Sequence, residues 1–164
     1  MNYYEGVVVD YLRADRSVFV NTECCIQLNA GENPDTSGPH WYCDALVSDF
    51  RNRSIFLCEI TYSLSLDALK KRLTGWNDNW PLLLEALHRD SHLPRDWPVR
   101  PWVFLPEQLI PLLLKRLAVL GATTPLSFQP LITPLELVQP WKYRSWNRVG
   151  EATKPDIVPE EMRT

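Results

Sequence analysis

The stretch that decides the fold runs from residue 40 to residue 62 and reads HWYCDALVSDFRNRSIFLCEITY. Its two outer parts, residues 40–50 and 54–62, are rich in β-branched and aromatic residues, which favour strands. Residues 51–54 (RNRS) between them are turn-like, so we predict a β-hairpin. Residues 18–28 have a similar composition and extend it to a three-stranded meander. Residues 29–39 (NAGENPDTSGP) predict the connecting loop.

On either side of this meander the hydrophobic period changes from that of a strand to that of a helix. Apolar residues recur at helical spacing from Leu66 to Trp76, and Ser65 is the expected N-cap. A second helix is predicted after Asn79, a fourth strand over 99–105 and a short helix over 111–120. Residues 2–16 also have helical spacing, although a run of three valines there suits a strand as well. The predicted order is helix, three strands, two helices, strand, helix.

The length and composition predict one globular domain with a tail. The chain has 164 residues, of which 45% are hydrophobic and 23% charged, and this excludes a wholly disordered protein. Residues 1–121 hold the predicted elements. Residues 122–164 contain six of the 14 prolines and predict an extended arm packed on the domain, loose from about residue 151.

Charge and apolar patterning narrow the class of protein further. No apolar stretch reaches the ~20 residues of a membrane span, and the first residues lack the basic start of a signal peptide, so we expect a soluble, cytoplasmic protein with no membrane partner. The net charge of −3 excludes an overall basic nucleic-acid-binding surface. Residues 1–60 hold four arginines and nine acids, whereas 61–120 hold eight basic residues and six acids. This contrast suits a metal site beside a phosphate-binding wall, or simple surface solubility.

The four cysteines, Cys24, Cys25, Cys43 and Cys58, form no CxxC pair and have no histidine at zinc-finger spacing. Without an export signal, disulfides are not expected. We therefore expect the thiols to act as small, buried apolar side chains.

Each strand of the hairpin places one acid in an apolar run. Strict alternation puts Glu59 on the same face as Leu57, and Asp44 on the same face as Leu46, with Cys43 on the opposite face. Leaving a carboxylate dehydrated in a core costs several kcal/mol unless it has a partner. If the strand register sets the two acids side by side, their repulsion calls for a cation such as Mg²⁺. Alternatively, each acid pairs with a nearby arginine, Arg51 or Arg53 (with Asp44 and Glu59 then purely structural).

The element order αβββαβ, with an Asp in the second strand and a Glu in the third, resembles the PD-(D/E)XK nuclease superfamily. The matching residues are Asp44 and Glu59-Ile60-Thr61, fifteen positions apart, and Glu5 stands where many members add a glutamate from the first helix. The resemblance covers roughly residues 2–105. It implies an α/β, restriction-endonuclease-like fold with a mixed four-stranded sheet flanked by helices.

The chain departs from this pattern at one position, because Thr61 stands where the superfamily has a lysine. A neutral hydroxyl cannot stabilise developing phosphate charge as an ammonium does. Some members supply the lysine from the following helix, and Lys70, at the edge of the leucine stripe, is the candidate here. It could equally be an ordinary lysine that covers apolar surface with its stem.

The resemblance implies hydrolysis of nucleic-acid phosphodiester bonds with Mg²⁺ or Mn²⁺. Asp44 and Glu59 would hold the metal, helped by the Ile60 carbonyl and Glu5, and Lys70 would orient water or neutralise the phosphate. Two alternatives stay open. The chain could keep the nuclease fold as an inactive binding or assembly module, or it could be an unrelated small scaffold protein.

A second candidate surface lies in residues 140–148 (PWKYRSWNR), where aromatic and basic residues alternate. Stacking aromatics and phosphate-binding cations together suit nucleic acid. We therefore name Lys142, Arg144, Trp146 and Arg148 as candidate nucleic-acid-binding residues. The alternative is an arm whose aromatics pack on the domain. A homodimer is a further open prediction.

Overall fold

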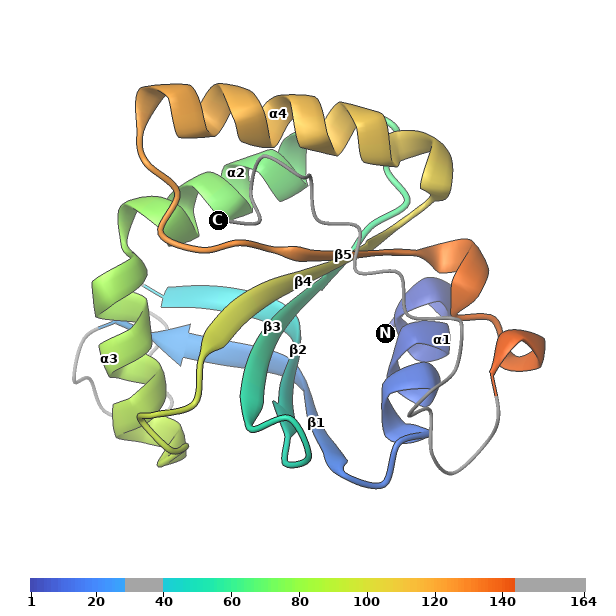
Figure 1. The fold of residues 1–164 in the computed structure, drawn as a ribbon, viewed down its shortest axis with the longest axis horizontal. Helices are drawn as coiled ribbons and strands as arrows, with labels where there is room; N and C mark the ends of the chain where they lie inside the picture. Colours follow the sequence, from blue (N-terminus) through green and yellow to red (C-terminus); the bar gives the residue numbers. More distant parts are fainter. Residues whose placement is uncertain (29–39, 144–164) are drawn as a thin grey trace.

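The fold is a five-stranded mixed sheet with helices on both faces (Figure 1), given by a computed structural model that describes residues 1–28 and 40–143. The strands are β1 (Val18–Gln27), β2 (His40–Asp49), β3 (Ser54–Ile60), β4 (Val99–Leu105) and β5 (Leu131–Pro134). The α-helices are α1 (Tyr3–Arg13), α2 (Asp67–Asp78), α3 (Trp80–Ser91) and α4 (Ile110–Thr123). Three short 3₁₀ helices follow β4 or β5, namely η1 (Glu107–Leu109), η2 (Leu135–Leu137) and η3 (Pro140–Lys142).

The sheet order is β1-β2-β3-β4-β5, so the strands lie side by side in chain order. The first three form the predicted antiparallel meander, and β4 and β5 then pair in parallel. The α/β class and the order of elements through α4 are confirmed. The expected count of four strands is wrong, because residues 131–134 in the proline-rich segment pair with residues 102–105 as β5. A four-residue strand between prolines has too little pattern to be seen in a sequence.

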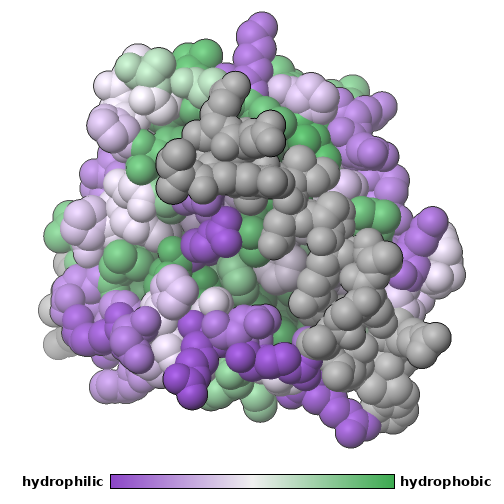
Figure 2. Space-filling view, in the orientation of Figure 1, coloured by the Kyte–Doolittle hydropathy of each residue, from purple (hydrophilic) through white to green (hydrophobic). Residues whose placement is uncertain are grey.

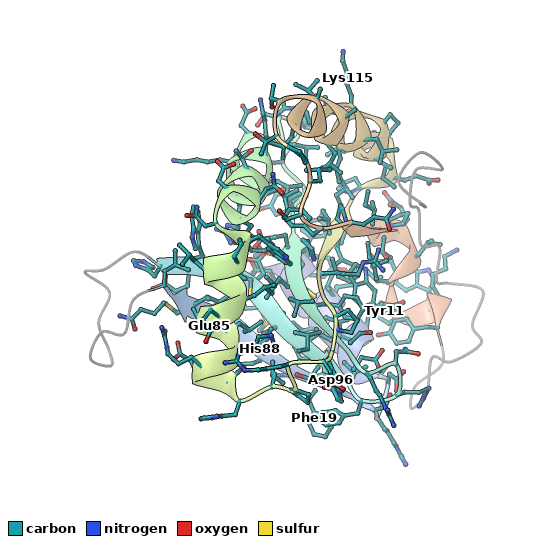
Figure 3. All side chains as sticks on the ribbon, turned by 60° about the vertical axis from the view of Figure 1, so that its left-hand side comes forward. Tyr11, Phe19, Glu85, His88, Asp96 and Lys115 are labelled. Atoms are coloured by element: carbon teal, nitrogen blue, oxygen red, sulfur yellow. The ribbon has the colours of Figure 1, made fainter. Side chains whose placement is uncertain are left out.

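The helices divide the core into two layers. On one face, which we call the α1 face, α1 packs against residues such as Val47 and Phe104, and Figure 3 shows Tyr11 lying between α1 and the sheet. On the other, the α2 face, α2, α3 and α4 cover residues such as Leu57 and Val103. Residues Leu131 and Leu135, from the predicted arm, are buried in the first layer. That part of the arm is therefore built into the core.

Helix ends differ from the sequence expectation at α2. The expected cap, Ser65, lies one residue early, since the N-cap is Leu66 with a φ of 55°. Helix α2 continues through Gly75 to Asp78. The reason for a glycine here is packing, because a Cβ at Gly75 would lie 2.2 Å from the indole ring of Trp41. The glycine therefore brings α2 close to the sheet at the end of β2.

The surface is mixed in character. Figure 2 shows hydrophilic residues gathered along the lower edge of the visible face, at the end of the sheet where the β2–β3 turn lies in Figure 1. That turn exposes Arg51, Asn52 and Arg53. Within residues 1–28 and 40–143, no helix combines the length and apolar character that crossing a bilayer requires.

Candidate functional site

The candidate site lies where the β2–β3 ladder ends. Paired residues run from Asp49 opposite Ser54 to Ala45 opposite Cys58. The next residues in this register are Asp44 and Glu59, and here Oδ2 of Asp44 accepts a hydrogen bond from the backbone N–H of Ile60 at 2.7 Å. The carboxylate thus binds a backbone donor at the end of the ladder. We call this end of the β2–β3 ladder, where Asp44 and Glu59 lie, the fork.

The side chains of strand β1 change from one face of the sheet to the other beside the fork. Val18 and Val20 pack on the α1 face, whereas Cys24 and Ile26 pack on the α2 face. All four positions are even-numbered, so strict alternation would place them on one face. The change occurs at Glu23, whose φ of 53° is in the left-handed region. A single residue in this conformation can re-aim the side chains that follow it.

The side chains of strand β2 change face at the matching position. Ala45 and Val47 pack on the α1 face, while Cys43 packs with Leu46 on the α2 face. The predicted alternation, which put Cys43 on the face of Ala45, is therefore wrong. Strict alternation fails because the side chains of both strands change face at the level of Asp44. The pairing register of β1 and β2 is the same before and after this point.

Arg72 of α2 closes the fork. Its Nη1 donates to Oε1 of Glu59 and to the carbonyl of Tyr42, each at 2.8 Å. Glu59 is only 6% exposed. The guanidinium therefore joins β2 and β3 at the point where they stop pairing. The arginine that pairs with Glu59 is thus Arg72 and not one of the two expected, Arg51 or Arg53, and Arg51 binds Asp15 at 3.3 Å.

Burial and neighbouring negative charges govern the protonation of the two acids. Burial, and then the charge of Asp44, raise the pKa of Glu59 to about 8, although Arg72 opposes this. Burial also raises the pKa of Asp44, and the hydrogen bond from Ile60 and the charge of Arg72 oppose that shift. At neutral pH the fork therefore holds a proton that a divalent cation could replace.

The other predicted site residues lie at different distances from the fork. Glu5 sits in a capping box, where its carboxylate accepts hydrogen bonds from the backbone and side-chain nitrogens of Asn2, and its charge contributes to the raised pKa of Asp44. The hydroxyl of Thr61 accepts a hydrogen bond from the N–H of Ser63 at 3.2 Å. Neither side chain contacts Glu59 through any hydrogen bond in the described residues.

Lys70 does not lie in the fork. It is exposed and lines a crevice between α2 and α4 with Leu66, Leu113 and Arg116. The cation that reaches the carboxylates is Arg72, which the sequence analysis did not single out. Lys70 and Arg72 flank the buried stripe of α2 on opposite sides. The residue types alone did not tell which flank faces the end of β3.

The described part of the second candidate surface is small. Trp141 is 76% exposed in η3, next to Lys142, whereas the ring of Tyr143 packs 5.2 Å from that of Tyr11. One aromatic of this segment is thus on the surface and the next packs on the domain. Arg144, Trp146 and Arg148 lie outside the described residues.

The donor set of the fork suits a hard divalent cation. Mg²⁺ is commonly held by one or two carboxylates together with water and substrate oxygens. Asp44 and Glu59 supply two such carboxylates. No three His, Cys, Asp or Glu side chains of residues 1–28 and 40–143 gather as a metal cluster.

Comparisons with protein families, with curated proteins and with solved structures find no match to this chain.

Proposed function

We propose that the protein is a Mg²⁺- or Mn²⁺-dependent phosphodiesterase that acts on nucleic acid, with a restriction-endonuclease-like arrangement of its first seven elements. The observation that carries the proposal is the fork, where two carboxylates stand on adjacent strands and Arg72 pairs with Glu59 while its charge also acts on Asp44. Burial and repulsion raise the pKa of both. A bound cation relieves this repulsion and stabilises the ionised form of both carboxylates.

Each residue of the fork has a distinct role in this proposal. Asp44 and Glu59 would hold the metal, and the hydrogen bond from Ile60 fixes the orientation of the Asp44 carboxylate. The metal, when bound, activates water and stabilises phosphate charge. The carboxylate of Glu5 is held by Asn2, so Glu5 would add negative charge near the fork rather than bind the metal directly.

Arg72 takes the part that the resemblance assigns to lysine. Its guanidinium is a permanent cation that binds oxyanions through several N–H groups, so it can neutralise a phosphate as well as a carboxylate. It reaches the fork from the helix that follows β3, as a displaced lysine would. For the metal to use Oε1 of Glu59, Arg72 must release that oxygen and becomes available to the phosphate.

Exposed aromatic rings support nucleic acid as the substrate class. Tyr42 is 42% exposed, and its carbonyl binds Arg72. Tyr62, three residues beyond Glu59, is 52% exposed, and its ring lies 4.7 Å from that of Tyr4. Such rings stack on nucleobases with little regard to sequence. We place the bases over these tyrosines when the phosphate is at the fork.

A second candidate function is an inactive nuclease-fold module for binding or assembly. The observation that favours it is the ion pair itself, because Arg72 already balances Glu59 without a metal. Thr61 in place of lysine points the same way. In that case Asp44, Glu59 and Arg72 would only stabilise the end of the sheet.

A cleavage assay separates the two functions. Single- and double-stranded DNA and RNA are incubated with the protein in Mg²⁺, in Mn²⁺ and in chelator. We expect metal-dependent cleavage that Asp44→Ala abolishes and that Asp78→Asn, at an exposed position of α2, leaves intact. If Asp44→Ala cleaves as fast as the parent, the fork is not the active site. If the parent binds nucleic acid but never cleaves it, the second function holds.

A further inference from the structure

Two of the four cysteines form a close pair next to the fork. All four are free thiols, and Cys43 and Cys58 are buried as expected from the sequence, but Cys25 is exposed and Cys24 half-buried. Cys24 and Cys43 are directly opposite one another in the β1–β2 ladder. Both pack on the α2 face. The next position in the same register is that of Glu23 and Asp44.

We propose that Cys24 and Cys43 are a redox site that a peroxide-class oxidant converts into an intrachain disulfide. Directly opposite residues of an antiparallel pair have Cα atoms about 4.5–5.5 Å apart, within the roughly 4.4–6.8 Å that disulfides span. Because the side chains already meet on one face, no change of register is needed. This proposal is independent of the phosphodiesterase function.

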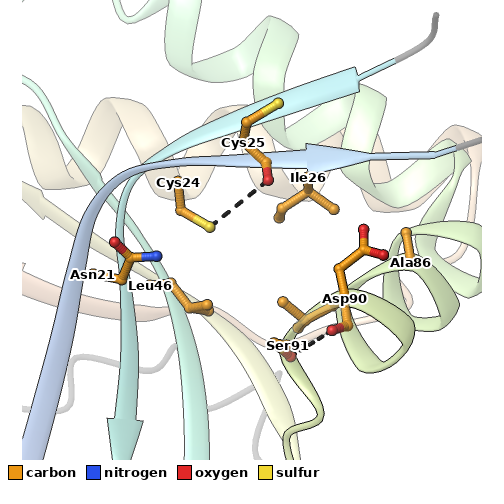
Figure 4. A pocket seen from close by; sticks show the side chains of 9 residues that line it. Asn21, Cys24, Cys25, Ile26, Leu46, Ala86, Asp90 and Ser91 are labelled. Carbon is orange, nitrogen blue, oxygen red and sulfur yellow. Dashed lines mark hydrogen bonds between the residues drawn. The ribbon is translucent and has the colours of Figure 1, made fainter. Parts of the chain in front are cut away.

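The two thiols differ in access, which assigns their order of reaction. Cys24 lines an open cavity of about 210 Å³ between β1 and α3, and Figure 4 shows its sulfur directed into this space among Asn21, Leu46 and Asp90. Cys43 is only 1% exposed. The oxidant therefore reacts with Cys24 first, and the buried Cys43 reacts with the oxidised Cys24 in the second step.

The electrostatics of the pair favour the same order. Contact with the Cys43 side chain lowers the pKa of Cys24, although burial opposes this shift. Thiolates, not thiols, are the nucleophiles. Cys24 is thus the better attacking sulfur, and Cys43 is the resolving one.

The reaction is balanced with one peroxide. The Cys24 thiolate attacks a peroxide oxygen, the O–O bond breaks, and the sulfur becomes a sulfenic acid, while the departing hydroxide takes the proton that the Cys24 thiol released and leaves as water. The Cys43 sulfur then attacks the Cys24 sulfur, the S–S bond forms, and the departing hydroxide takes the Cys43 proton as a second water. Two thiols are oxidised by two electrons, and the peroxide is reduced.

Mass spectrometry of the full chain tests this site. The folded protein is treated with one equivalent of hydrogen peroxide, its remaining thiols are alkylated after unfolding, and peptides are mapped without reductant. We expect the loss of two hydrogen atoms, a link between residues 24 and 43, and full reversal by dithiothreitol. Unchanged mass, a link through Cys25, or a link between chains would overturn the proposal.

Matched variants assign the two roles. Cys43→Ala should leave Cys24 as a sulfenic acid that dimedone captures, because the resolving thiol is gone. Cys25→Ala, at the exposed neighbour, should form the disulfide as the parent does. Circular dichroism confirms that each variant is folded. If Cys43→Ala gives no dimedone adduct at Cys24, or if Cys25→Ala blocks the disulfide, the assignment is wrong.

Discussion

The two ends of the β2–β3 hairpin both hold buried acids beside an arginine, yet they treat those acids differently. At the end near the turn, which we call the turn end, Asp15 accepts hydrogen bonds from the backbone and hydroxyl of Ser17 and pairs with Arg51. Asp49 accepts two backbone N–H groups and the side chain of Asn52. These donors come from residues close in the chain or in the same turn.

At the fork the donors come from the neighbouring strand and from α2. Asp44 accepts a hydrogen bond from the backbone of Ile60, and Glu59 is held by Arg72 and by the backbone of Asp44. Burial, and then the charge of Asp44, raise the pKa of Glu59 to about 8. The comparison teaches that a buried acid with several local donors closes a turn, whereas two neighbouring acids that repel one another retain capacity for a cation.

The largest effect on stability should come from the turn end. Asp15→Ala removes the acceptor for Ser17 and one ion-pair partner of Arg51, so the free energy of unfolding should fall by about 3 kcal/mol. Urea denaturation measures this value. Asp10→Ala, at an exposed position of α1, is the control and should change it by less than about 0.5 kcal/mol. An equally small change in Asp15→Ala would mean that the turn end does not depend on its acid.

The fork should make the protein less stable as pH rises. The pKa of Glu59 is about 8 in the folded chain and near 4.5 when unfolded, so between these values the folded state binds the extra proton. Stability is therefore greatest below the lower value and is lost as pH approaches 8. From pH 5.5 to 7.5 the parent should lose roughly 2 kcal/mol more than Glu59→Gln does. Parallel pH profiles for the two proteins would show that Glu59 is ionised throughout.

A smaller effect is expected from removing the shared cation. Arg72→Met leaves ionised Glu59 without its partner, and because Arg72 is partly exposed we expect a loss of about 1–2 kcal/mol at pH 8. At pH 5.5, where Glu59 is protonated, the loss should be less than half as large. Arg72→Lys keeps a charge and serves as the matched control. A pH-independent loss would assign Arg72 to packing alone.

Much of the fold could be predicted from the sequence because its elements have strong local signals. The alternation and turn residues of 40–62 predict the hairpin, and the leucine spacing predicts α2. The fifth strand could not be predicted, since Leu131–Pro134 owe their conformation to pairing with β4. The same holds for the inversion at Glu23, where a tertiary requirement overrides the period of a strand.

Of the residues in the candidate site, only the two acids could be predicted from the sequence. Asp44 and Glu59 stand out because each is a lone charge in an apolar strand, and that signal is local. The choice between Lys70 and Arg72 depends on how α2 is rotated over the sheet. Trp41, which packs on Gly75 from another element, bears on that rotation. Helical spacing therefore identified a basic flank but not the side chain that reaches Glu59.

Mn²⁺ binding followed by isothermal titration calorimetry at pH 7, in two buffers of different protonation enthalpy, tests the central claim most directly. The fork should bind Mn²⁺ and release a proton, because the metal replaces the one held by Glu59. Glu59→Gln and Asp44→Asn should lose this binding, and Asp78→Asn should keep it. Failure of the parent to bind Mn²⁺, or equal binding by Glu59→Gln, would contradict the account.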